Sequence, residues 1–467
     1  MKGRQVIRTV RIPRVCRIGH DHGVRQGHRL GLLVVVTGVF MLSLDVTMLD
    51  IVLPDIAKAI DADLTEISWI ADCYNIALAG LILLGAGLGG RFGQRRVYLI
   101  GLAIFGIGSI CASIASDPLA LIATRTVMGI GAAGMAAPAV ALTGTMFPGD
   151  QRTRALATWA AASGIGLAVG PILGGLIISV ANWRWIFFIL VPFVVVMLFV
   201  GRTALPIGNA LDRRPLDLPG AALSALALIP LVAGLLQVPE FGWLNPWVLT
   251  GVILGMVLLG AFTWHEARTT APMIDVTVLR VPLVSAAALA LAASYVGFLG
   301  LQFLASLELR SSFGLNPVEA GLTLAPWAIL YWVGARVGAY LSTRIRSTTV
   351  VLCGLSILCV SFAMLAALST RGPMWVGLGL AVAGVGCGLI TPVAVSLMLA
   401  FTPESKLSTS SGLSMVVRYG GGAIGMAVCA SAAATGGASG WGYLAGGVLV
   451  VALTLGTFAL RGRMPTA

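Results

Sequence analysis

The sequence predicts an all-α integral membrane protein whose chain crosses the bilayer fourteen times. Of its 467 residues, 58% are hydrophobic and only 10% are charged, whereas about a quarter of the residues of an average soluble domain carry a charge. Charged and Gly/Pro-rich breaks divide the apolar sequence into stretches of about 20 residues, which is the length that a helix needs to cross a hydrocarbon core of about 30 Å. In a soluble chain, a net charge of +12 would suggest binding to nucleic acid. In a membrane protein, the positions of the basic residues indicate which loops lie inside, so we expect no nucleic-acid partner.

Each predicted span is placed by its first residue. The spans begin near residues 31, 68, 97, 119, 155, 185, 217, 247, 283, 319, 349, 374, 409 and 438. A short basic loop after a glycine-containing helix end follows both the second and the tenth span, which predicts two similar halves with two additional helices between them. The predicted organisation is a basic cytoplasmic tail (1–30), a six-helix half (31–203), two extra helices with linkers (204–282) and a second six-helix half (283–467).

The distribution of basic residues predicts the orientation of the chain. With the amino terminus inside, the inner segments hold 23 of the 30 Lys and Arg residues and the outer loops hold four. Because inner loops of membrane proteins are enriched in Lys and Arg, we expect a multi-pass protein of the cell membrane, in bacteria the cytoplasmic membrane, with both termini in the cytoplasm. The basic tail is expected to contact anionic lipid.

The first span carries two aspartates in an otherwise apolar run. Counted back from Pro54, Asp45 lies roughly 12 Å below the outer end, whereas Asp50 lies within about a turn of that end. A carboxylate at the depth of Asp45 costs about 2.5 to 3.5 kcal/mol, so it should face a bundle interior or a watery cavity and handle a proton or an ion. The alternative for Asp45 is a purely structural pairing. For Asp50 we expect an interfacial acid whose side chain reaches toward the headgroups.

The fourth span contains a permanently charged residue, Arg125, roughly 9 Å inward from a helix start at Asp117 and Pro118. Its depth resembles that of the aspartates in the first span. An Asp–Arg pair inside the first half would lower the desolvation cost of both charges and tune the proton affinity of the acid. The alternative is a static strut without a role in proton transfer.

The fifth span contains Gly166, Gly170 and Gly174 at four-residue intervals, with Gly175 beside the last and Pro171 among them. On a helix this spacing makes a stripe without side chains, which permits a close approach of another backbone, and the proline favours a kink. The pattern predicts a pliable helix suited to a gate, or else simple close packing.

Five motifs in this order resemble the drug:proton antiporter family with fourteen spans, which is part of the major facilitator superfamily. They are LDVTMLDIVLP, GLGGRFGQRR, RTVMGIGAAG, GPILGG and NWRWIFFI. The resemblance implies the major facilitator fold and proton-driven efflux across a cytoplasmic membrane. It gives Asp45 the place of the family's first-helix acid and Arg125 that of its fourth-helix arginine. It also implies that Gly166, Gly170, Pro171, Gly174 and Gly175 form the family's antiporter motif. Arg91, Gly93, Arg95 and Arg96 correspond to the family's loop signature.

The chain departs from the family pattern at several positions. Gly90 replaces the loop's usual aspartate, whose charge is expected to stabilise one gate conformation. Asp50 replaces an asparagine, a change expected to alter coupling or cation preference, and we count Asp50 with Asp45 and Arg125 among the candidate proton-coupling residues. Asp72 stands where a neutral polar residue is more common, and we expect it to be interfacial, near the outer end of the second span. In the thirteenth span, Arg418 is followed by Tyr419 instead of the family's glutamine.

Arg418 lies about 15 Å into its span and has no acid nearby in the sequence. Three roles remain for it: a place in the central cavity, a pairing across the two halves, or binding of an anionic group. We therefore count Arg418, Tyr419 and Asp72 as candidate cavity residues.

The predicted activity is proton-coupled export of amphipathic small molecules or drugs by alternating access. The alternatives are export of an endogenous metabolite, a lipid or an anionic compound, or a non-transporting receptor on the same fold. The sequence has no phosphate-binding loop, no metal-ligand cluster and no nucleophile elbow, so we expect no enzyme, no metal and no cofactor beyond the proton gradient. The expected partners are the substrate, protons and the bilayer, and we expect a monomer.

Overall fold

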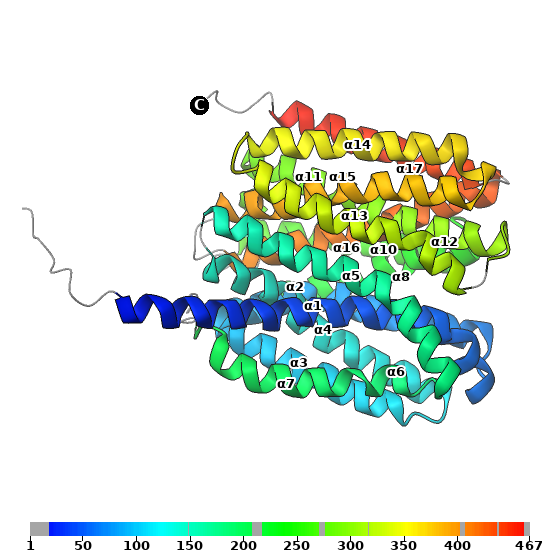
Figure 1. The fold of residues 1–467 in the computed structure, drawn as a ribbon, viewed down its shortest axis with the longest axis horizontal. Helices are drawn as coiled ribbons and strands as arrows, with labels where there is room; N and C mark the ends of the chain where they lie inside the picture. The colour runs from blue at the N-terminus through cyan, green and yellow to red at the C-terminus, as the bar shows by residue number, and fades with distance from the viewer. Residues whose placement is uncertain are drawn as a thin grey trace, which may run out of the picture.

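Every regular element that the structure describes is a helix. The computed structural model describes residues 18–147, 149–207, 217–269, 276–315, 317–401, 407–436 and 439–461. The helices lie side by side along the long axis of the molecule (Figure 1). Residues 1–17, most of the predicted basic tail, lie outside the described residues.

The first half consists of five long helices and a sixth, broken one. They are α1 (Ile18–Ile60), α2 (Leu64–Phe92), α3 (Gln94–Ser113), α4 (Pro118–Met146), α5 (Asp150–Val180), and α6 (Trp185–Phe188) with α7 (Leu190–Ala204). The first turns of two of these helices are stabilised by side-chain hydrogen bonds. Asp63 and Glu66 form a reciprocal capping box at α2, and Asp117 accepts a hydrogen bond from the Ala120 amide at the predicted start of α4, with Pro118 in the first turn. These contacts satisfy amide groups that a helix start leaves without partners.

Two further helices pack on the outside of the bundle. They are α8 (Leu218–Leu236) and α10 (Pro246–Arg268), with the short α9 (Val238–Phe241) between them. A Cβ atom at Gly251 would lie 2.8 Å from the Pro230 carbonyl oxygen, and one at Gly255 would lie 2.5 Å from Leu231 Cβ. Small residues therefore bring α8 and α10 into close contact, and α8 also contacts α2 of the first half and α16 of the second.

The second half repeats the pattern of long helices. Its elements are η1 (Val276–Arg280), α11 (Pro282–Tyr295), η2 (Val296–Leu301), α12 (Gln302–Ser311), α13 (Pro317–Leu341), α14 (Ser347–Leu368), η3 (Ser369–Arg371), α15 (Pro373–Ala400), α16 (Leu407–Gly436) and α17 (Ser439–Arg461). The elements α11, η2 and α12 form one span in which η2 is a π-helical turn. Such turns are often found at functional sites.

The described residues contain twelve helices that are long and apolar enough to cross a membrane, and a thirteenth if the two bent parts of α5 count as one span. The predicted tenth span, α13, is 25 residues long but is not among them. The count of fourteen is thus not confirmed. Apart from the first, each predicted span begins within five residues of a helix start, the widest difference being residue 155 against Asp150.

The expectation that the first span ends at Pro54 is wrong, because α1 continues to Ile60. A proline inside a helix removes one hydrogen bond, and here the residues beyond it still pack into the core. Ile56 is fully buried and Ile60 is almost so. As a result, Asp50 lies ten residues, or about 15 Å, from the end of α1 and not within a turn of it.

Candidate functional site

A buried ion pair joins α1 and α4. Arg125 Nη1 lies 2.6 Å from Asp45 Oδ2, and the two side chains are 0% and 2% exposed. Arg125 Nε donates to the Ile70 carbonyl at 3.5 Å, and the guanidinium lies 4.6 Å from the centre of the Tyr74 ring. The structure thus brings together the two charges whose pairing we expected, and each offsets part of the desolvation cost of the other.

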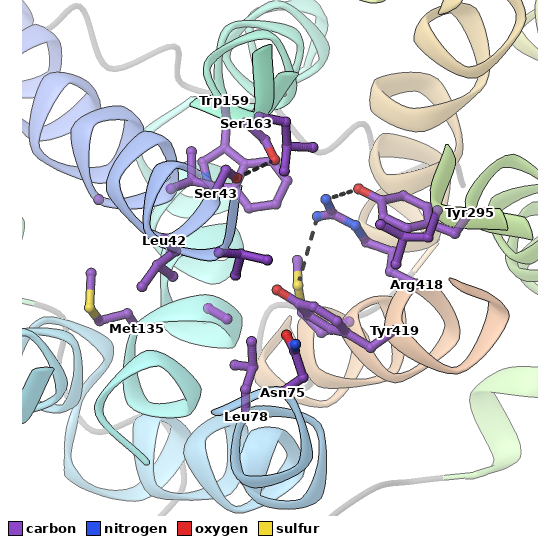
Figure 2. A pocket seen from close by; sticks show the side chains of 18 of the residues that line it. Leu42, Ser43, Asn75, Leu78, Met135, Trp159, Ser163, Tyr295, Arg418 and Tyr419 are labelled. Atoms are coloured by element: carbon purple, nitrogen blue, oxygen red, sulfur yellow. Dashed lines mark hydrogen bonds between the residues drawn. The ribbon is translucent and has the colours of Figure 1, made fainter. Parts of the chain in front are cut away.

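A central pocket of about 110 Å³ lies between the two halves (Figure 2). Ser43 of α1 and Ser163 of α5 share a hydrogen bond of 2.8 Å in its wall, and Asn75 of α2 adds an amide. Tyr74 also lines this pocket. Because the same ring lies against Arg125, Tyr74 links the pocket to the buried ion pair.

Arg418 of α16 forms the opposite wall of the central pocket. Its guanidinium lies 4.4 Å from the Trp159 ring centre and 4.5 Å from that of Tyr295, and the side chain is 4% exposed. One terminal nitrogen, Nη2, donates to the Tyr295 hydroxyl. Trp159 belongs to the first half and Tyr295 to the second, so Arg418 faces the central cavity and also bridges the halves, through aromatic rings and not through an acid.

A larger outer cavity, of about 790 Å³, lies toward the end of the bundle where α1 meets α2 and α12 meets α13. Asp50 from the first half and Arg310 from the second both line it. Asp50 is exposed to this cavity, ten residues before the end of α1. The expectation of an interfacial Asp50 is therefore corrected, because the longer α1 places the residue on a cavity wall. The central pocket and the outer cavity are neighbours, because they share five lining residues: Val46, Asn75, Leu167, Leu299 and Tyr419.

Asp72 also lines the outer cavity, and it connects an extra helix to the first half. Gln237 at the end of α8 donates to Asp72 Oδ2 at 3.1 Å. The predicted place among the lipid headgroups is thus corrected to a wall between helices. This pairing explains how a carboxylate is accommodated there, since a hydrogen bond compensates part of its lost hydration.

The glycine stripe of α5 packs against α1, the helix that carries Asp45. A Cβ atom at Gly166 would lie 2.5 Å from the Phe40 carbonyl oxygen, and one at Gly174 would lie 3.1 Å from that of Met48. At Gly170, a Cβ atom would overlap the Thr47 hydroxyl oxygen. The predicted close backbone approach is confirmed for these three glycines.

The helix α5 bends by 41° between its parts 151–167 and 172–180. The predicted kink residue, Pro171, falls in this interval, although its side chain lies outside the described residues. Gly175 follows the bend and is half-buried. The bend therefore lies beside the part of the stripe that contacts α1.

The loop signature lies at the other end of the bundle from the outer cavity. Gly93 alone separates α2 from α3 and has a φ of 94°, a conformation that residues with a Cβ atom rarely adopt. Arg95 donates to the Arg202 carbonyl at the end of α7, while Arg91 is half-buried and Arg96 is exposed. Gly93 and Arg95 therefore join helix ends, and none of the four residues of the signature lines the central pocket or the outer cavity.

The halves are in contact at the end that the sequence places inside. Thr153 of α5 donates to Ser396 of α15 at 2.7 Å. A Cβ atom at Gly412 of α16 would lie 2.7 Å from Ala86 Cβ of α2. The two halves therefore meet at this end, while the outer cavity occupies the other.

Sequence reasoning missed most of the pocket wall. Tyr74, Trp159 and Tyr295 gave no signal, because aromatic residues are common in apolar spans and only the folded chain shows which rings meet a guanidinium. Asn75 could have been found, since an amide within an apolar run requires a partner or a polar cavity.

Comparisons with known proteins agree with this architecture. The model of the Major Facilitator Superfamily matches residues 35–426 and, a second time, 287–466. The multidrug resistance protein Stp of Mycobacterium tuberculosis (strain CDC 1551 / Oshkosh) is 30% identical over 406 residues, which cover 86% of this chain and 75% of Stp. The cephamycin export protein CmcT of Amycolatopsis lactamdurans is 32% identical over 406 residues, which cover 85% and 83% of the two chains.

Among solved structures, the human organic anion transporter MFSD10 superposes with a TM-score of 0.68 at 18% identity, covering 92% of this chain and 99% of that one. At this identity the likeness concerns the fold. The family match covers most of the chain, and the all-helical membrane architecture agrees with it. The protein is a multi-pass membrane transporter and not an enzyme, and it belongs to the major facilitator superfamily.

Proposed function

We propose that this chain exports amphipathic small molecules, drugs among them, across a bacterial cell membrane in exchange for protons. One observation supports the coupling most directly: the buried Asp45–Arg125 pair contacts the wall of the central pocket through Tyr74. The relatives' names, a multidrug resistance protein and a cephamycin export protein, support the class of cargo.

In the proposed cycle, Asp45 alternates between an ionised state paired with Arg125 and a protonated state. Protonation removes the countercharge of a guanidinium that is fully buried, so the packing of α1 against α4 must change. The Tyr74 ring transmits this change to the pocket. One carboxylate can then couple the two fluxes if proton and substrate exclude each other.

Protons reach Asp45 from the outer cavity in this proposal. Asp50 lines that cavity and lies five residues further along the same helix, about 7.5 Å along its axis. Asp50 is therefore a relay position, in keeping with its replacement of the family's usual asparagine.

Alternating access requires a conformation open to each side. A bundle with an outer cavity and contacts at the predicted inner end suits the outward-facing state, provided that both termini lie in the cytoplasm as proposed. The stripe of α5 on α1 is the contact that we expect to move. In this topology α13 is a fourteenth span, held within the bundle by α15 and α5.

The experiment is a transport assay on the purified full-length chain in liposomes. A pH-sensitive dye trapped inside reports proton movement when an amphipathic compound is added against an imposed pH gradient. We expect proton flux that depends on the compound and on the gradient. Flux that stays at the level of protein-free liposomes across a broad panel of cationic, neutral and anionic compounds would favour a non-transporting receptor instead.

A further inference from the structure

The central pocket has an unbalanced charge. Among the side chains that line it, Arg418 is the one with a formal charge, and the other polar groups are hydroxyls, the Asn75 amide and the Trp159 indole N–H. Asp45 does not line the pocket and is already paired with Arg125. A substrate in this pocket therefore meets a single positive charge in a poorly hydrated site, where its field is strong.

The guanidinium of Arg418 has donors without good acceptors. A guanidinium presents five N–H groups in a planar fork. In the described structure one nitrogen donates to the Tyr295 hydroxyl, Nη1 meets only the Met415 sulfur at 3.7 Å, and Nε has no hydrogen-bond partner. A thioether is a weak acceptor, and buried donors of a charged group are costly to leave unpaired.

Two aromatic rings lie close to the guanidinium, and its edge points toward the pocket. Trp159 and Tyr295 lie against Arg418, while Figure 2 shows its terminal nitrogens directed toward the space between the helices. A cation in this pocket would be repelled by the positive charge of Arg418. An anionic oxygen acid, in contrast, can accept two N–H groups of the fork at once.

No described acid of the protein is placed to fill this role. Asp50 and Asp72 line the outer cavity and not the pocket. Glu308 of α12 is buried elsewhere, where it accepts hydrogen bonds from Ser439 and, at 2.8 Å, from Tyr443. The missing acceptor is therefore expected from outside the chain.

We propose that the central pocket binds amphipathic anions, with a carboxylate or a similar oxygen acid at Arg418 and the apolar body against Leu42, Leu78 and Met135. These three side chains line the pocket on the side away from Arg418 (Figure 2). This inference rests on the proposed export function and specifies its substrate class. A body larger than the pocket extends past Asn75 and Tyr419 into the outer cavity.

The test compares three probes with one ring system: 1-naphthoate, neutral 1-naphthamide and cationic 1-naphthylmethylamine. Their binding to the purified chain is measured by calorimetry at pH 7 without a proton gradient. We expect naphthoate to bind at least about tenfold more tightly than the amide, as a charge-assisted hydrogen bond allows, and the amine to bind most weakly. In Arg418→Gln the preference for naphthoate over the amide should vanish, and Arg418→Lys, which keeps the charge but not the fork, should retain part of it.

Arg336→Gln is the matched control, because it removes an exposed arginine of α13 that lines neither cavity. It should preserve the preference. If wild type and Arg418→Gln bind the amide equally well, the pocket still forms in the variant. If Arg418→Gln no longer binds the amide, Arg418→Lys takes its place, and a partly retained preference for naphthoate is expected there. Any of four results overturns the inference. In the wild type these are equal binding of naphthoate and amide, tighter binding of the amine than of naphthoate, or no naphthoate binding at millimolar concentration. The fourth is an intact preference for naphthoate in Arg418→Gln. The binding measurement uses no proton gradient, so it is independent of the transport assay in liposomes. If the chain prefers the anion in calorimetry but shows no proton-driven export in liposomes, the proposed proton coupling is wrong and the anion site stands.

Discussion

Two arginines lie buried within the helices, and each is stabilised in a different way. Arg125 is paired with a carboxylate and leaves one terminal nitrogen, Nη2, without a hydrogen-bond partner. Arg418 has no carboxylate beside it, lies against two aromatic rings and leaves Nε without a partner. The first arrangement could be predicted, because a charge in an apolar run stands out and Asp45 has a similar depth. The second could not, because nothing in the sequence distinguishes Trp159 from other aromatic residues in membrane spans.

At this scale we predict that Asp45→Asn abolishes uphill export driven by a pH gradient while the protein remains in the membrane. The amide cannot carry the exchanged proton, although it can still accept a hydrogen bond from Arg125. Downhill exchange of substrate should survive if the pocket still forms. The measurement is substrate-dependent proton flux in liposomes that contain equal amounts of each variant.

Asp50→Asn and Asp72→Asn are the comparison variants. Asp50→Asn restores the family's usual residue and should retain more coupling than Asp45→Asn, and Asp72→Asn should retain still more because an amide can keep the bond to Gln237. Wild-type coupling in Asp45→Asn together with its loss in Asp50→Asn would show that the cavity-facing acid has taken over the coupling role.

The contact between α1 and α5 is the element on which the proposed cycle depends. The spacing of Gly166, Gly170 and Gly174 predicted a face without side chains, and the structure has one. The partner helix could not be predicted, since a small-residue stripe does not specify which backbone it meets. The end of α1 was misplaced for a related reason: Pro54 is a local signal, and burial of Ile56 outweighs it.

We predict that Gly170→Leu inserts into the membrane but loses transport. A side chain at this position overlaps Thr47 and approaches the Met48 amide nitrogen at 3.1 Å, so α1 and α5 must separate. Gly260→Leu is the matched control, because a Cβ atom at this position of α10 has open space around it. Initial transport rates, normalised to the protein in the membrane, should fall by at least about tenfold in the first variant only, a cost of about 1.4 kcal/mol. Equal rates in both would show that the stripe is not a tight moving contact.

At the scale of the whole molecule, the two halves meet at one end and enclose a cavity at the other. The basic-residue bias predicted which end is inside, and the helix starts agree with the predicted spans. The cavity itself could not be predicted, because it depends on how the halves lean against each other and not on any one helix.

The proposed orientation predicts the accessibility of two exposed positions at opposite ends. In a variant without its native cysteines, Ala59→Cys near the α1–α2 turn should react with a membrane-impermeant thiol reagent added to intact cells. Gln151→Cys at the start of α5 should react only after the membrane is permeabilised. The opposite result at both positions would invert the topology, and with it the side toward which the outer cavity faces.

The wall shared by the central pocket and the outer cavity has a kinetic consequence. Asn75 and Tyr419 belong to opposite halves and line both spaces. In the proposed outward-facing state, we expect a molecule released from Arg418 to leave between them. The width of this passage determines how fast a substrate dissociates, whereas the equilibrium affinity depends on the contacts in the pocket. Two compounds of equal affinity should therefore differ in turnover when their cross-sections differ, and the bulkier one should leave more slowly.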